Sequence, residues 1–203
     1  MKRGLLVILT ILFISACTMP ETKIYSINIH DSTILPPPKA DKGEEGGFSS
    51  VASIVIRVHS QRYLTQPYIA YRNSPYQLEI SRYSKWVSPP SDMVKDAFKD
   101  SFSSSGIFKE VRVFNTVPEG FYLLEVNLKR FERSDTGKDS FGELLFDVNL
   151  FSPDGKEIYH STISKSVKLD DKSFLSLAKG LSNALAEGIV EVENSTIKSI
   201  CTL

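Results

Sequence analysis

Residues 122–131 read YLLEVNLKRF and alternate apolar with polar side chains. Residues 143–151, ELLFDVNLF, repeat this pattern, and residues 157–167 follow it after the turn Pro153-Asp154-Gly155. A period of two is typical of a β-strand with one buried face, and short turns favour antiparallel neighbours. We therefore predict that these three segments form an antiparallel meander.

Two amphipathic helices are predicted to cover this sheet. One starts after Ser88-Pro89-Pro90, with Ser88 as the cap and proline in the first turn, and ends at Gly106. The other opens at Asp170 and Asp171, whose charge suits a helix N-terminus. Apolar residues recur at helical spacing in both segments: Met93, Val94, Ala97, Phe98 and Phe102 in the first, and Phe174, Leu177, Ala178, Leu181, Leu185, Ile189 and Val192 in the second. The expected fold is a single α+β domain with a largely antiparallel sheet and two helices on one face.

Further strands are expected at residues 24–29, 54–58 and 107–114, and a tyrosine-rich hairpin at residues 62–80. Residues 31–50 contain a proline triplet followed by glycine and charged residues, which is typical of a linker. We interpret this stretch as a long exposed loop. The alternative is that residues 31–50 are the true tether and residues 24–29 are disordered.

The N-terminus has the layout of a secretory signal. Lys2 and Arg3 precede an apolar run that ends in Ser15-Ala16, and Cys17 follows directly. This order resembles the lipobox of bacterial lipoproteins, in which the peptide is cut before the cysteine and the cysteine is acylated. The apolar run is too short for a transmembrane helix, which needs about 20 residues. We expect residues 1–16 to be removed and Cys17 to carry the lipid.

The lipidated cysteine sets the expected organisation of the mature chain. Residues 17–23 form a short tether, residues 24–196 the domain and residues 197–203 a C-terminal tail. Six residues reach only about 20 Å, so the domain is expected close to the membrane. In Gram-negative bacteria, an aspartate directly after the lipidated cysteine tends to retain a lipoprotein at the inner membrane. Because Thr18 stands at this position instead, we expect the protein on the periplasmic face of the outer membrane.

The charge balance argues against nucleic acid as a partner. The chain has 24 basic and 24 acidic residues, and removal of Lys2 and Arg3 leaves a net charge near −2. Cys201 has no partner within the chain once Cys17 is lipidated. It is expected to be incidental, although a terminal thiol also leaves a disulfide-linked homo-oligomer open.

No catalytic, cofactor-binding or metal site is predicted. His30, His59 and His160 lie far apart in the sequence and lack metal-ligand spacing. The chain has no Gly-x-Ser-x-Gly motif, and its paired carboxylates lie in a linker and at a helix start. We expect a protein that is not an enzyme.

One segment combines aromatic and basic residues. Tyrosine, tryptophan and arginine are the residue types that dominate protein–protein hot spots. The candidate partner-binding residues are Arg62, Tyr63, Tyr68, Tyr71, Arg72, Tyr76 and Trp86. The other interpretation, that half of them pack in the core or on the sheet, stays open.

The order of these residues resembles the ABC-type transport auxiliary lipoproteins. The matching features are Arg62-Tyr63-Leu64, then residues 67–72 (PYIAYR), then residues 76–79 (YQLE), and then Trp86 before an amphipathic helix. The resemblance covers residues 23–192, and the charged loop at residues 31–50 departs from it. It implies a periplasm-facing adaptor that is anchored in a membrane and engages the MCE component of an ABC-type or MCE-type lipid transport system.

Two other functions are alternatives to the adaptor. An outer-membrane activator of a cell-wall synthase usually has a long disordered tether, and the short stretch before Ile24 counts against it. A lipid carrier needs its own apolar cavity, and a sheet covered by two helices leaves no obvious room for one.

Overall fold

The computed structural model describes residues 21–29 and 52–202. The signal segment, Cys17 and the loop at residues 31–50 lie outside these residues, so what was expected of them stays a prediction.

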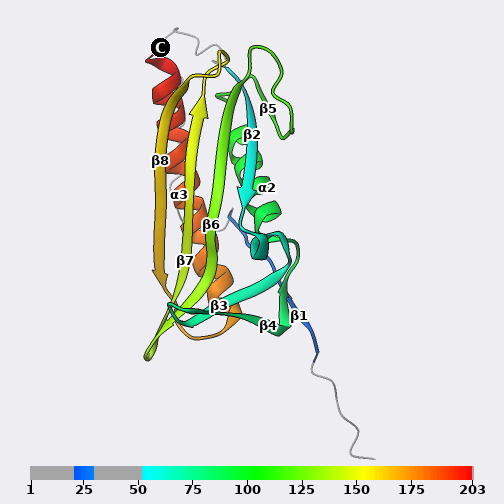
Figure 1. Cartoon of the computed structure of the whole chain (residues 1–203), viewed down its shortest axis with the longest axis vertical. Coiled ribbons are helices and arrows are strands. Elements are labelled where there is room, and N and C mark those ends of the chain that lie inside the picture. The colour runs from blue at the N-terminus through cyan, green and yellow to red at the C-terminus, as the bar shows by residue number, and fades with distance from the viewer. Residues whose placement is uncertain (1–20, 30–51, 203) are drawn as a thin grey trace, which may run out of the picture.

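The described residues form eight strands, two α-helices and one 3-10 helix (Figure 1). In chain order they are β1 (Lys23–Tyr25), β2 (Ser53–Ser60), η1 (Arg62–Thr65), β3 (Tyr68–Ser74), β4 (Gln77–Trp86), α2 (Pro90–Ser104), β5 (Glu110–Arg112), β6 (Tyr122–Thr136), β7 (Asp139–Phe151), β8 (Glu157–Lys168) and α3 (Phe174–Cys201).

All eight strands belong to one sheet, in which β6 is the central strand. On one edge β6 pairs antiparallel with β7, and β7 pairs antiparallel with β8, as the meander prediction requires. The other edge of β6 is shared by two strands, because its first half pairs parallel with β2 and its last part pairs parallel with β3. Strand β5 pairs with the other edge of β2. On the other side, β4 pairs with the free edge of β3, and β1 pairs with the free edge of β4.

The predicted fold class is confirmed: one α+β domain whose longest ladders are antiparallel. The sheet as a whole is mixed, because the pairs β1–β4, β2–β5, β2–β6 and β3–β6 are parallel. Parallel neighbours are far apart in sequence, so turn residues give no sign of them.

Both helices pack on the same face of the sheet, behind it in Figure 1. Phe146 of β7 lies under both of them. Its ring is 5.7 Å from the ring of Phe98 in α2, and it faces Gly188 of α3. Every predicted apolar position of the two helices is buried except Phe174, which is half-buried.

A β-bulge in β6 decides which residues face the helices. The register shifts between Leu128 and Arg130, so one extra residue interrupts the alternation. Phe131 therefore continues the buried face after Leu128, and Glu132 points to the opposite face, away from the helices. The bulge is what brings a charged residue to the centre of the outer sheet face.

Several element boundaries differ from those predicted. Residues 62–65 form the 3-10 helix η1, not a strand, and β5 covers only three residues of the expected segment 107–114. The N-cap of α2 is Pro89 and has no side-chain hydrogen bond, so the predicted Ser88 cap is wrong. Gly106 follows this helix with a φ of 69°, as its role at the C-terminus requires.

Helix α3 is capped by Ser173, whose Oγ accepts a hydrogen bond from the Ser176 amide at 3.1 Å. Asp171 lies just before this cap, where its carboxylate accepts a hydrogen bond from the Ser173 amide at 2.7 Å. The helix continues to Cys201, so residues 197–201, which were expected to be a tail, are helical.

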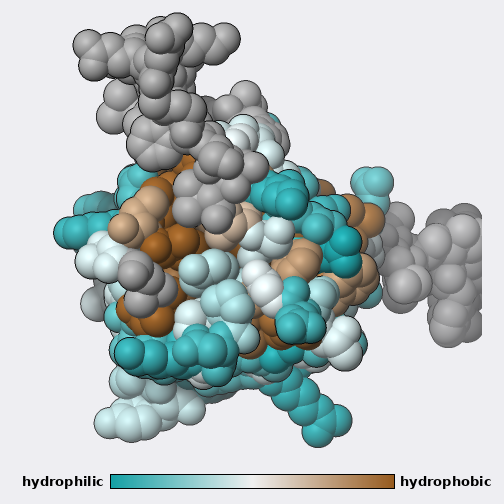
Figure 2. Space-filling model, turned by 90° about the horizontal axis from the view of Figure 1, so that it is seen from above, coloured by the Kyte–Doolittle hydropathy of each residue, from teal (hydrophilic) through white to brown (hydrophobic). Residues whose placement is uncertain are grey.

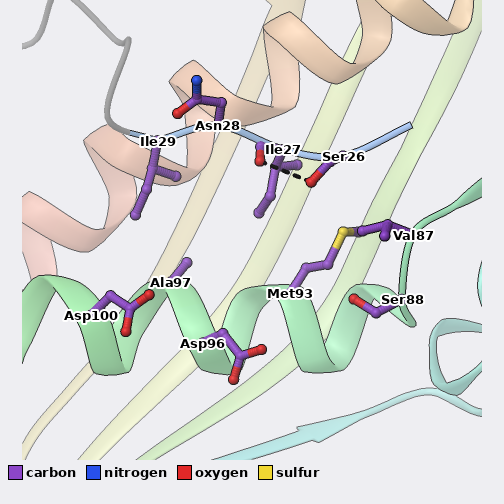
Figure 3. A pocket seen from close by; sticks show the side chains of 10 residues that line it. All are labelled: Ser26, Ile27, Asn28, Ile29, Val87, Ser88, Met93, Asp96, Ala97 and Asp100. Carbon is purple, nitrogen blue, oxygen red and sulfur yellow. Dashed lines mark hydrogen bonds between the residues drawn. The ribbon is translucent and has the colours of Figure 1, made fainter. Parts of the chain in front are cut away.

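The segment that follows β1 is docked against the helices. Residues 26–29 run between α2 and α3, and Ile27 and Ile29 point toward α2 (Figure 3). The amide of Asn28 donates a hydrogen bond to Ser182 Oγ of α3 at 3.0 Å. The alternative in which residues 24–29 are disordered is therefore wrong.

The molecule is elongated, and its two ends differ (Figure 1). We call the end that carries β1, the β3–β4 hairpin and the start of α3 the hairpin end, and the end that carries the C-terminus and the β5–β6 loop the far end. Helix α3 spans both: its 28 residues rise about 1.5 Å each, or about 40 Å in total. Figure 2 views the far end, where apolar patches are interrupted by polar side chains.

Candidate functional site

The seven candidate partner-binding residues lie in three different environments. Trp86 is in the core, with 2% of its surface exposed and its ring centroid 5.4 Å from that of Phe131 in an edge-to-face contact. Its indole Nε1 has no hydrogen-bond partner among the described residues. Trp86 cannot contact a partner protein in this structure, because its large apolar ring is buried in the core between the sheet and the helices.

Tyr63 and Arg72 belong to a polar network on the outer face of the sheet, away from the helices. Its centre is Glu132, which is 1% exposed. Arg72 Nε donates to Glu132 Oε1 at 2.6 Å, and the Tyr63 hydroxyl donates to Oε2 at 3.0 Å. The same hydroxyl lies 3.2 Å from the carbonyl oxygen of Lys129, at the bulge. Both oxygens of the buried carboxylate are thus hydrogen-bonded, as burial of a charge requires.

The network shifts the titration of its members. Burial raises the pKa of Tyr63 well above its ordinary value of 10.0, and the neighbouring Glu132 carboxylate raises it further. The hydrogen bond from Arg72 to Glu132 raises the pKa of the guanidinium. The hydroxyl therefore stays protonated and the guanidinium charged, and together they fasten η1 and β3 to β6.

Tyr71 occupies the opposite face of β3, where a second cluster joins the hairpin to the start of α3. The guanidinium of Arg133 lies 5.0 Å from the ring centroid of Tyr71 and 5.1 Å from that of Phe174. The same guanidinium donates to Asp135 Oδ2 at 3.0 Å and to the backbone carbonyl of Lys172. This stack fixes the position of the N-terminus of α3 on the sheet.

The remaining three candidates are exposed. Arg62 lies on η1, Tyr68 is 40% exposed at the start of β3, and Tyr76 is 96% exposed at the tip of the hairpin. Tyr68 and Arg72 lie four residues apart on β3, and Arg62 precedes this strand on η1. We call Arg62, Tyr68 and Arg72 the outer-face patch. Tyr76 is separate from it.

Two of the open grooves on the described part of the molecule border the N-terminal segment or the hairpin end. One, of about 280 Å³, lies between residues 26–29 and α2 and is lined by Met93, Asp96 and Asp100; Met93 extends toward Val87 (Figure 3). The other, of about 680 Å³, lies at the hairpin end. Its lining includes Tyr71, Ile80, Arg82, Tyr83, Arg133 and Phe174.

Metal-ligating side chains do not converge in the described ranges. No group of three or more His, Cys, Asp or Glu residues within 21–29 and 52–202 has the geometry to hold a metal ion. His59 lies 3.9 Å from Glu125, and His160 contacts Asn149. Within the same ranges, no helix is long and apolar enough to cross a bilayer.

Sequence analysis missed Glu132 and Arg133 and treated Phe174 only as part of a core stripe. A signal was present in residues 130–135, RFERSD, where charged residues continue a strand whose other face is buried. Charges at such positions need partners, and the arginine and tyrosine residues of β3 and η1 supply some of them. Which of them pair depends on the parallel contact between β3 and β6, which the sequence does not reveal.

Known proteins resemble this chain in sequence and in fold. A family model described as ABC-type transport auxiliary lipoprotein component matches residues 35–192. A crystal structure of a Xanthomonas campestris protein of family DUF330 superposes with a TM-score of 0.70 at 18% identity, covering 87% of this chain and 96% of that one. An uncharacterized protein of known structure superposes with a TM-score of 0.63 at 17% identity, covering 86% and 99% of the two chains. These two likenesses are of fold alone. No curated protein matches the sequence.

Proposed function

The chain belongs to the ABC-type transport auxiliary lipoprotein family, and from this premise we propose that it is a membrane-anchored adaptor of an ABC-type or MCE-type intermembrane lipid transport system. The family assignment, which covers residues 35–192, is the observation that carries the proposal. It makes the chain a lipoprotein of the cell envelope that is associated with ABC-type transport.

The proposed anchor is the acylated Cys17 in the outer membrane, with the domain on the periplasmic side. The lipobox-like order of residues 12–17 supports it, as does Thr18 after the cysteine. Two or three acyl chains hold a protein firmly on a bilayer, since each buried methylene contributes about 0.8 kcal/mol.

We propose an adaptor that neither catalyses a reaction nor carries lipid itself. Where β7 meets α2 and α3, the space between sheet and helices is filled by side chains, which argues against an acyl-chain site at this point. Phe146 illustrates this: its ring touches Phe98, and a Cβ added at Gly188 would lie 3.2 Å from its Cζ atom. A side chain with so little room on either side leaves no space for an acyl chain at this point between the layers.

The outer-face patch is the proposed docking surface for the transporter's MCE component. Arg62 and Tyr68 are exposed, while Arg72 is held by Glu132 and is 25% exposed. A patch whose backbone is fixed in advance loses little conformational entropy on binding. Tyrosine and arginine on such a base are typical of hot-spot residues.

The test is co-purification from cell envelopes in gentle detergent, with the tagged, lipidated chain as bait and mass spectrometry as readout. We expect the wild-type chain to recover an MCE protein with its permease and ATPase. The double variant Arg62→Ala, Tyr68→Ala should lose most of this recovery while it stays in the membrane fraction and keeps its circular dichroism spectrum.

The matched control is Phe114→Ala, which removes a 51% exposed aromatic side chain from the far end. It should recover the transporter as well as the wild-type chain does. Recovery of a cell-wall synthase by the wild-type chain would replace the adaptor with the activator function. Equal loss in both variants would remove the outer-face patch as the docking surface.

A further inference from the structure

We infer that the hairpin end is a second membrane contact, in which exposed aromatic and aliphatic side chains of β1 and the β3–β4 hairpin enter the interface of the bilayer that holds the lipid anchor. This inference rests on the Cys17 anchor of the proposed function, but not on the identity of the transporter.

The length of chain between the anchor and the fold is the first argument. The described fold begins at β1, and Lys23 is paired with Ser84 of β4. Only six residue steps separate Cys17 from Lys23, so this part of the chain spans at most about 20 Å in any conformation. The anchor therefore holds the hairpin end near the bilayer surface.

The exposed side chains at this end are the second argument. Tyr76 at the hairpin tip is 96% exposed and Tyr83 is 48% exposed, and among the aliphatic residues Ile24 is 68% and Ile80 39% exposed. The hairpin lies across the long strands at this end of the molecule (Figure 1). Tyrosine is enriched at membrane–water interfaces, where its ring meets acyl chains and its hydroxyl meets headgroups.

The charges at this end are compatible with a lipid surface. Strands β1 and β4 carry three basic residues, Lys23, Arg82 and Lys85, and one acidic residue, Glu79, which accepts a hydrogen bond from Asn73 at 2.7 Å. Asp170 and Asp171 are exposed in the loop before α3 at the same end. The opposing charges leave apolar contact as the main attraction, so we expect insertion to depend little on anionic lipid.

Helix α3 provides a reference position that lies far from the hairpin end. Phe174, its first residue, packs against Tyr71 and Tyr25 with ring centroids 6.2 Å apart in both pairs. Cys201, its last residue, is exposed and lies about 40 Å along the helix from Phe174. A molecule held upright on its hairpin end keeps Cys201 far from the lipid.

The experiment uses the full lipidated chain in vesicles of phosphatidylethanolamine and phosphatidylglycerol that contain a doxyl-labelled phospholipid as quencher. In one sample an environment-sensitive fluorophore is attached to the native Cys201. In the other it is attached at the hairpin tip of a Tyr76→Cys, Cys201→Ser variant. We expect several-fold stronger lipid quenching at residue 76 than at residue 201, and a blue-shifted emission at residue 76 only.

A second variant separates insertion from mere proximity. Ile80→Ser and Tyr83→Ser, added to the labelled Tyr76→Cys chain, should reduce quenching at residue 76 several-fold, because both side chains are partly exposed and their loss weakens the apolar contact. Equal quenching at residues 76 and 201 would overturn the inference, since the molecule would then lie flat. A blue-shifted emission at residue 76 that arises only when an MCE protein is added would also overturn the inference, because the hairpin would then be a protein-binding surface.

Mass spectrometry of the mature chain separates this inference from the proposed function. An unmodified Cys17 would remove the tether argument, and the inference would fall with the anchor. A lipidated chain whose residue 76 stays in water would overturn the inference and leave the adaptor function standing.

Discussion

Glu132 is the residue on which the outer face of the sheet depends most. Its carboxylate is buried on the face that the helices do not cover, and Arg72 and Tyr63 occupy one oxygen each. Removing one partner of a buried charge is costly, because the charge that remains has lost its compensation. The network thus links η1, β3 and β6 through a single side chain.

Tyr63 makes this network sensitive to alkaline pH. Because burial and Glu132 raise its pKa above 10.0, the unfolded chain releases this proton at a lower pH than the folded chain does. The contribution of Tyr63 to stability is therefore complete below pH 10 and is lost as the pH rises further, by about 1.4 kcal/mol per pH unit. Denaturant unfolding across the ordinary tyrosine pKa should show this slope, and Tyr63→Phe should reduce it; part of it remains, because the hydrogen bond with Glu79 also raises the pKa of Tyr71.

The same variant should be less stable at neutral pH by about 1–3 kcal/mol, because it leaves one oxygen of Glu132 without its partner. Tyr76→Phe is the matched control, since Tyr76 is 96% exposed. It should change neither the stability nor the slope. An unchanged alkaline slope in Tyr63→Phe would contradict the role assigned to this hydroxyl.

Trp86 is a core residue, so its replacement should act on stability. Trp86→Ala removes a ring that is packed edge-to-face on Phe131, and we expect a loss of about 3–5 kcal/mol in the free energy of unfolding. Trp86→Phe should cost much less, because Nε1 has no hydrogen bond to lose among the described residues. Circular dichroism during denaturation measures both. A fully stable Trp86→Ala chain would contradict the burial of this ring.

At the scale of elements, Gly188 marks a point where helix α3 lies close to the sheet. A Cβ on Gly188 would lie 3.2 Å from Ile163 Cγ2 and 3.2 Å from Phe146 Cζ. Phe146 has little freedom to move, because Phe98 of α2 contacts its ring. Glycine is therefore present here for close approach to the sheet.

Gly188→Ala should destabilise the protein despite its better helix propensity. Alanine gains about 1 kcal/mol in a helix, whereas overpacking a tight core costs about 1–3 kcal/mol. Asn183→Ala, at an exposed position of the same helix, should instead stabilise by a few tenths of a kcal/mol. Urea denaturation of the two variants tests this. A stabilised Gly188→Ala chain would contradict this prediction, because it would show that the Phe146 ring can shift to accommodate the added methyl group.

The elements that were predicted well are those whose signal is local. The alternation in residues 122–131 and 143–151 and the helical stripes predict the meander and both helices, because period and turn chemistry are properties of neighbouring residues. The shared edge of β6 depends on contacts between segments that are 60 or more residues apart, such as Tyr71 with Arg133.

The site was predicted less well than the fold, for a related reason. Tyrosine, arginine and tryptophan serve both interfaces and cores, and the sequence does not say which side of β3 or β4 will be covered. Arg62, Tyr68 and Tyr76 are exposed, but Tyr63 and Arg72 are drawn into the Glu132 network. Only the pairing of β3 with β6 decides between these outcomes.

At the scale of the whole molecule, the lipid anchor is predicted to depend on one cysteine. Cys17→Ser should abolish acylation, leave the precursor uncut and reduce retention in the membrane fraction, because no thiol remains to receive the lipid. Fractionation and intact mass measure these changes. Cys201→Ser is the matched control and should be processed and retained like the wild-type chain. Normal processing of Cys17→Ser would contradict the lipobox assignment.

The way the N-terminal segment joins the fold also sets its mechanical strength. In the proposed adaptor, a load from the Cys17 anchor would enter the described fold at Lys23, and a pull along the axis of β1 would shear the parallel β1–β4 ladder rather than unzip it. Two further hydrogen bonds follow the ladder along the chain and would carry the rest of the load. They run from the Val87 amide to the Tyr25 carbonyl and from the Asn28 amide to Ser182 Oγ. In the proposed adaptor role, such tension would arise whenever the two membranes move apart. The short strand at the entrance to the domain is then a shear clamp that protects the sheet and both helices from unravelling.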